Sequence, residues 1–176
     1  PMEEVGTNEK GVSVSAMVTL RANGKVTGAD PMVDGGMCES DMATILLSEA
    51  TTAKEGVELL LDIYNTVGAE EKSGVLIADQ NEIWYVENFT GHTYTAIKLS
   101  SHMITINPNM GAIGLVDLDD TENVIASANL ISVAEQAGTF VGDKNENTID
   151  VFKSYCYYAS GTPSERLVNG INYFLD

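Results

Sequence analysis

Apolar and polar positions alternate near the start of the chain and then change to a helical spacing. Residues 12–20 read Val-Ser-Val-Ser-Ala-Met-Val-Thr-Leu, an alternation that predicts a half-buried strand. The Asn23-Gly24 pair is typical of a turn such as a hairpin reversal. Residues 30–36, with one proline and two glycines, predict a loop. From Ser40 the apolar positions take the spacing of a short helix.

A second helix carries a clear start signal. Thr52-Ala-Lys-Glu55 is the pattern of a capping box, in which a threonine and a glutamate each satisfy a backbone N–H of the first turn. Gly68 is typical of a helix end. Between them, four apolar side chains fall on one helical face: Val57, Leu60, Leu61 and Tyr64.

The middle of the chain is rich in β-forming residues. The predicted strands cover residues 74–78, 83–87, 93–99 and 102–106. Asp79-Gln-Asn81 supplies the residues of a tight turn between the first two, and Gly91 separates the second from the third.

The last third of the chain predicts mainly helices. A helix is expected over residues 122–136, with acidic residues near its positive amino end and Gly138 as its stop. After a loop over residues 142–147, helices are expected over residues 149–158 and from Thr162-Pro-Ser-Glu165. Grouped strands followed by grouped helices predict an α+β fold, and 176 residues predict a single domain over residues 1–176.

The charge balance excludes several partner classes. The chain carries 26 acidic and 9 basic residues, for a formal net charge of −17. Such a surface repels nucleic acid and anionic lipid but can attract a peptide amine. No apolar run approaches the roughly 20 residues that span a bilayer, and the first residues lack signal-peptide features, which favours the cytoplasm. The Asp117–Glu122 cluster lacks the spacing of a calcium loop, so we predict no metal and no cofactor.

The two cysteines are far apart and form no metal-binding or redox motif. Small, partly buried side chains are the simpler interpretation of Cys38 and Cys156. A nucleophilic Cys38, with His92 or His102 as base, remains an alternative because its Gly-Gly-Met-Cys loop lies beside a candidate site.

Several short motifs occur along the chain in a particular order. They are Asn8-Glu-Lys-Gly11, Glu39-Ser-Asp41, Leu76-Ile-Ala-Asp79, Trp84-Tyr-Val-Glu87, Gly91-His92, Pro108-Asn109 and Asp117-Leu-Asp-Asp-Thr-Glu-Asn123. In order and spacing, over about residues 8–138, they together resemble the C69 dipeptidases, which are cysteine members of the N-terminal nucleophile (Ntn) hydrolases.

The resemblance implies an αββα sandwich that hydrolyses dipeptides. An amino-terminal cysteine would attack the amide, and its own α-amine, with a pKa of about 8, would serve as base. No residue here matches that cysteine or the Arg and Asp that follow it in the relatives. We therefore expect a fragment that lacks the nucleophile segment at its amino terminus and is inactive alone. Its sheet should expose an edge that a homo-oligomer or a further strand could cover.

The resemblance also implies two site residues. Asn109 is the candidate oxyanion donor, with closure of a turn after Pro108 as the alternative. Glu39 is the candidate ligand of the substrate amine, with helix capping as the alternative, whereas capping is the favoured role of Asp41. One relative has an asparagine where this chain has Val18 and Thr19, so its oxyanion geometry does not transfer directly.

Other residues of these motifs have structural interpretations. We expect Glu87 to be a hydrogen-bonded structural carboxylate, Trp84 to belong to the core, and His92 to be structural. The principal prediction is part of a cysteine dipeptidase. The alternative is a non-catalytic domain of the same descent that binds peptides or a partner protein.

Overall fold

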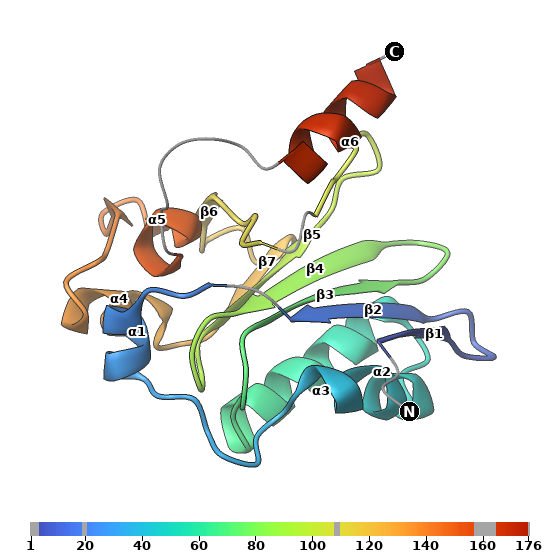
Figure 1. The fold of residues 1–176 in the computed structure, drawn as a ribbon, viewed down its shortest axis with the longest axis horizontal. Coiled ribbons are helices and arrows are strands. Elements are labelled where there is room, and N and C mark those ends of the chain that lie inside the picture. Colours follow the sequence, from blue (N-terminus) through green and yellow to red (C-terminus); the bar gives the residue numbers. More distant parts are fainter. Residues whose placement is uncertain (1–3, 19–20, 108–109, 157–164, 176) are drawn as a thin grey trace.

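The computed structural model describes residues 4–18, 21–107, 110–156 and 165–175, and an antiparallel sheet of six strands forms its centre (Figure 1). The spatial order is β1-β2-β3-β4-β5-β7. The strands are β1 (Val5–Thr7), β2 (Ser13–Val18), β3 (Ser73–Ala78), β4 (Ile83–Asn88), β5 (Tyr94–Lys98) and β7 (Val124–Ala126). In the described chain β1 has no neighbour on its outer side, and Val5 is 71% exposed there, in agreement with the predicted exposed edge.

The central hairpin follows from local sequence. The Asp79 carboxylate accepts hydrogen bonds from the backbone N–H groups of Asn81 and Glu82 at 2.7 and 3.1 Å, which fixes the turn between β3 and β4. The register then places Ile77 opposite Trp84. The predicted strands here are confirmed, but residues 102–106 form no strand. Strand β7 pairs with the edge of β5 that residues 102–106 would have used, so no strand edge is left there for them to pair with.

Two helices cover one face of the sheet, α2 (Glu39–Glu49) and α3 (Ala53–Thr66). Both were expected from the apolar spacing. The Thr52 hydroxyl accepts a hydrogen bond from the Glu55 N–H at 3.1 Å, and Gly68 follows the helix with a φ of 88°. The core between helices and sheet includes Val14, Val57, Leu60, Tyr64, Val75, Ile77, Trp84 and Val86.

A second hydrophobic cluster lies against the opposite face of β4 and β5. It involves α1 (Gly24–Ala29), α4 (Leu130–Gln136), α5 (Val151–Tyr155) and a small sheet in the order β6-β9-β8. The strands of that sheet are β6 (Leu115–Asp117), β8 (Gly142–Asp143) and β9 (Thr148–Asp150). The buried centre of the cluster includes Tyr85, Phe89, Ile113, Leu130 and Tyr155.

Four sequence predictions for these outer segments are wrong wholly or in part. Asn23 does not turn a hairpin but caps α1, because its side chain accepts a hydrogen bond from the Lys25 N–H at 2.8 Å. The helix predicted over residues 122–136 is limited to α4, and its first part is strand β7. The loop over residues 142–147 contains β8. In the described part of residues 149–158, the first two residues belong to β9 and the helix is α5. Thr162 lies outside the described residues.

Helix α6 (Glu165–Leu175) extends from the rest of the molecule in Figure 1 and approaches Ile106 at Gly170. Within the described part of the chain, no helix is long and apolar enough to cross a bilayer. Helices combined with antiparallel sheets confirm the α+β class.

Candidate functional site

Glu39 lies at a cavity of about 390 Å³ beside the half-buried face of β2 and β3. The cavity is lined in part by Glu4, Ser15, Met17, Glu39, Leu76 and Asn107. Residues from five separate segments therefore meet here. The candidate substrate ligand Glu39 shares this cavity with Asn107, which precedes the candidate oxyanion donor by two positions in the sequence. Asn109 itself lies outside the described residues.

Two contacts hold Glu39 at the start of α2. Its carboxylate accepts a hydrogen bond from the Val18 N–H at 2.5 Å, which joins the helix to the end of β2. Its own N–H donates to the Glu71 carboxylate at 2.6 Å. The expected capping role of Asp41 is wrong in this form, because the Asp41 carboxylate accepts from the Cys38 thiol at 3.1 Å. The distant Glu71 supplies the acceptor at this helix start.

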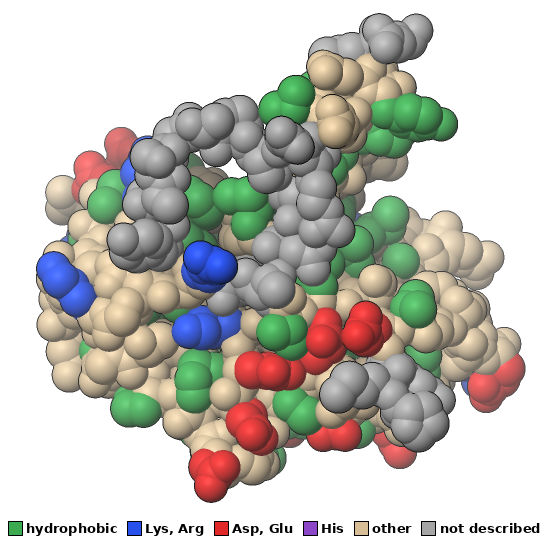
Figure 2. Space-filling model, viewed as in Figure 1, with side chains coloured by type: hydrophobic (Ala, Val, Ile, Leu, Met, Phe, Trp, Pro, Cys, Tyr) green, Lys and Arg blue, Asp and Glu red, His purple; other side chains and the backbone are tan. Residues whose placement is uncertain are grey.

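The electrostatics of the cavity favour a cation. Burial raises the pKa of Glu39, the Val18 N–H opposes this shift, and the negative charges of Glu4 and Glu71 add to it. Among the residues that the structure describes, no lysine or arginine forms an ion pair with these three glutamates. Acidic side chains also predominate over the lower half of the face in Figure 2.

Glu87 anchors the segment that brings Asn107 to the cavity. Its carboxylate accepts hydrogen bonds from the Tyr85 hydroxyl and the Ala112 N–H, both at 2.7 Å, and from the Ile113 N–H at 3.3 Å. The Asn107 side chain lies near the same Tyr85 hydroxyl. Burial raises the pKa of Glu87 to about 7, against the lowering effect of its three donors. The predicted structural carboxylate is confirmed.

Asn88 anchors the segment before β3. Its side-chain oxygen accepts from the Ser73 N–H and hydroxyl at 2.9 and 3.0 Å and from the Tyr64 hydroxyl at 3.2 Å. Its side-chain N–H donates to the Glu71 backbone carbonyl at 2.8 Å. Sequence analysis missed Glu71, Asn88 and Asn107. Only the mixture of polar and apolar residues at the end of β4 could have indicated Asn88.

Neither cysteine has the environment of an activated nucleophile. The Ser40 hydroxyl alone would lower the pKa of the Cys38 thiol, but the Asp41 carboxylate and burial outweigh it, so the pKa is raised. Burial, with the charge of Glu87, raises the pKa of Cys156 to about 12.

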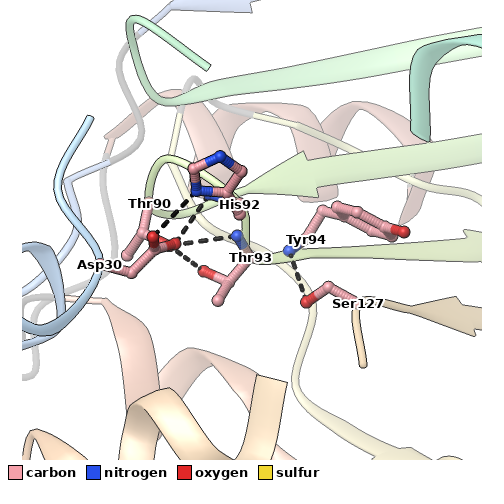
Figure 3. A network of polar contacts seen from close by, with 6 residues as sticks. All are labelled: Asp30, Thr90, His92, Thr93, Tyr94 and Ser127. Carbon is pink, nitrogen blue, oxygen red and sulfur yellow. Dashed lines mark hydrogen bonds and ion pairs between the residues drawn. The ribbon is translucent and has the colours of Figure 1, made fainter. Parts of the chain in front are cut away.

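His92 belongs to a separate polar network, shown in Figure 3. The Asp30 carboxylate faces the His92 ring Nδ1 at 3.0 Å and accepts from the His92 backbone N–H at 2.7 Å and the Thr90 hydroxyl at 2.5 Å. These contacts tie the loop after α1 to the turn between β4 and β5, which supports the structural role. Trp84 is 1% exposed, as expected of a core residue, and the Lys54 ammonium lies 4.4 Å from its ring centre.

The acidic cluster before β7 forms turns. The carboxylates of Asp117 and Asp120 accept hydrogen bonds from the backbone N–H groups of Asp119 and Asn123 at 2.9 and 3.3 Å. Within the described ranges, no group of three or more His, Cys, Asp or Glu side chains is arranged to hold a metal ion.

Comparison with known proteins agrees with the sequence motifs. The family model "Peptidase family C69" matches residues 1–169. A "Probable dipeptidase B" of Streptococcus pyogenes serotype M6 is 40% identical over 153 residues, which cover 87% of this chain and 30% of that protein. A "Probable dipeptidase" of Latilactobacillus sakei is 36% identical over 128 residues, or 73% of this chain and 27% of that protein. The chain thus spans about 30% of the length of these curated relatives. It belongs to peptidase family C69.

Proposed function

We propose that this chain forms the part of a cysteine dipeptidase that binds the amino end of the substrate and stabilises the oxyanion. The observation that carries the proposal is the position of Glu39, a partly buried carboxylate without a described cationic partner, in a cavity that it shares with Asn107. A dipeptidase must distinguish a free α-ammonium group from an internal peptide bond. A carboxylate held by the Val18 N–H offers a charge-assisted hydrogen bond for that purpose.

Asn109 is the proposed oxyanion donor. It follows the cavity residue Asn107 by two positions, and Glu87 fixes the segment just beyond it through Ala112 and Ile113. A side-chain amide at such a position is worth about 2.7–4 kcal/mol of transition-state stabilisation.

The proposed nucleophile is an amino-terminal cysteine outside these 176 residues, with its own α-amine as base. The raised pKa values of Cys38 and Cys156 support this assignment, because a reactive thiol requires the opposite shift. The proposed architecture is the αββα sandwich of Ntn hydrolases. The side chains Met17 and Leu76, on the sheet face opposite α2 and α3, support it, because they pack against the second hydrophobic cluster and are still only half-buried.

The test uses the product of the complete gene and two substrates, an unmodified dipeptide and its N-acetyl derivative. We expect hydrolysis of the free dipeptide only. Glu39→Gln should raise KM for that substrate with little change in kcat, because a ground-state contact is lost. Glu49→Gln is the matched control, since Glu49 is exposed at the other end of the same helix.

Two outcomes would contradict the proposal. Unchanged kinetics in Glu39→Gln would exclude Glu39 as the amine ligand. Binding of the dipeptide in calorimetry, with no hydrolysis by the wild-type protein, would identify a peptide-binding domain instead of an enzyme.

A further inference from the structure

Two adjacent buried polar residues end strand β4 and project to opposite faces of the sheet. Glu87 shares its face with Tyr85, whereas Asn88 contacts Tyr64 of α3 on the other side. Asn88 reaches Glu71, which contacts the cavity residue Glu39, and Glu87 reaches residues 112–113, which follow the cavity residue Asn107 along the chain. A single strand end is thus connected to two walls of the proposed site.

The first wall of the cavity is the one that contains Glu39, and Asn88 supports it through Glu71. Asn88 donates to the Glu71 carbonyl at 2.8 Å, and the Glu71 carboxylate accepts the Glu39 N–H at 2.6 Å. Asn88 is 1% exposed and has four described hydrogen bonds, so its orientation is fixed. It acts on Glu39 through one intermediate residue.

The second wall of the cavity is the one that contains Asn107, and Glu87 supports the segment that follows it. Glu87 is fully buried and accepts from the Ala112 and Ile113 N–H groups. It also accepts from the hydroxyl of Tyr85, which lies near the Asn107 side chain. Glu87 therefore holds residues 112 and 113, which follow the proposed oxyanion donor Asn109 by three and four positions in the sequence. Backbone N–H groups held by a carboxylate give a more rigid support than a solvated loop.

We propose that Glu87 and Asn88 are positioning residues of the active site, Glu87 for the oxyanion wall and Asn88 for the amine-binding wall. This inference rests on the proposed function. It predicts that changes at the two residues affect different kinetic parameters, a result that general destabilisation of the protein cannot produce. Loss of the Asn88 contacts should weaken substrate binding, and loss of the Glu87 contacts should slow the chemical step.

The experiment compares Asn88→Ala and Glu87→Gln in the complete gene product. Asn88→Ala should raise KM for the free dipeptide about tenfold or more, and Glu87→Gln should lower kcat by a similar factor. The Asn88→Ala effect should disappear in a Glu39→Gln background, because both changes act on one contact, whereas the Glu87→Gln effect should persist. Tyr64→Phe and Tyr85→Phe remove one hydroxyl from each network and serve as milder variants if the first pair folds poorly.

Two control variants separate position from stability. Leu60→Ala weakens the core between α3 and the sheet without touching the cavity. Thr95→Val changes a buried hydroxyl of the neighbouring strand that has no hydrogen-bond partner among the described atoms. Both should leave kcat and KM close to the wild-type values. If Glu87→Gln or Asn88→Ala behaves like these controls, the inference is wrong.

Hydrogen exchange gives a readout that does not depend on activity. Asn88→Ala should speed exchange in peptides that contain the Glu39 N–H and leave those with Ala112 and Ile113 unchanged, and Glu87→Gln should do the reverse. A wild-type protein that hydrolyses no dipeptide would reject the proposed function. The exchange pattern would still decide the positioning, since a pattern shared by both variants would overturn it.

Discussion

The Glu71 carboxylate accepts a hydrogen bond from the Glu39 backbone N–H at 2.6 Å, although the two residues are 32 positions apart. The residue at the N-cap position, Cys38, makes no capping hydrogen bond with its side chain. Helix α2 therefore begins against a carboxylate from the segment before β3. The start of this helix and the position of Glu39 depend on tertiary structure rather than on a local motif.

Replacement of Glu71 should consequently destabilise the protein. Glu71→Ala removes the acceptor and should lower the free energy of unfolding by about 0.5–2 kcal/mol, the usual range for a lost cap. Glu71→Gln keeps an oxygen acceptor and should lower it by less. Urea unfolding measures both, with the exposed neighbour variant Glu70→Ala as control. An equal effect of Glu70→Ala and Glu71→Ala would contradict the capping role.

Glu87 should make stability depend on pH in an unusual direction for a glutamate. Burial raises its pKa from the ordinary 4.5 to about 7 in the folded protein. Between these values the folded state holds a proton that the unfolded state has released, so the free energy of unfolding decreases as pH rises through this window. At about 1.36 kcal/mol per pKa unit, the total change is about 3 kcal/mol.

The difference between wild type and Glu87→Gln isolates this effect from the other carboxylates. Urea unfolding at pH 4.5, 6 and 8 should show the wild type losing stability relative to the variant as pH rises, with no further relative loss well above pH 7. A wild-type protein that gains stability relative to Glu87→Gln over the same range would show that Glu87 is ionised throughout.

Local signals predicted the parts of the fold that local interactions determine. The turn bonds of Asp79 and the capping bond of Thr52 join residues at most three positions apart, and both features were identified. The segment over residues 122–136 has helix-favouring acidic residues, yet Ile125 pairs with Ala96 of β5. Its strand conformation comes from a free sheet edge, which a window of sequence does not contain.

The same distinction applies to the candidate site. Glu39 was proposed because Glu39-Ser-Asp41 resembles an acidic motif of the C69 dipeptidases, which the sequence itself shows. Its support by Glu71 and Asn88 was not found, since these contacts join segments that are distant along the chain. The donors to Glu87 include backbone N–H groups of Ala112 and Ile113, for which side-chain identity gives no signal.

Gly91 should be sensitive to the smallest substitution. A Cβ atom at this position would lie 2.1 Å from the Pro31 carbonyl oxygen, so Gly91→Ala must separate the loop after α1 from the turn that carries His92. We expect a loss of about 1–3 kcal/mol in the free energy of unfolding, as for other overpacked sites. Gly114→Ala, with nothing within 4 Å of the added atom, is the control in thermal or urea unfolding. Similar losses in both variants would show that this close approach is absent.

Cys38 should be dispensable for catalysis. Its raised pKa, set by the balance of Ser40 against Asp41 and burial, leaves little thiolate at neutral pH. Cys38→Ala should therefore retain the dipeptide hydrolysis of the complete gene product within about twofold, and the rate of iodoacetamide alkylation of Cys38 should rise only above the pH at which an ordinary thiol ionises, near about 8.5. Asp41→Asn removes the negative charge and should shift the alkylation profile to lower pH. Complete loss of hydrolysis in a folded Cys38→Ala protein would instead identify Cys38 as the nucleophile, and the amino-terminal cysteine mechanism would then be wrong.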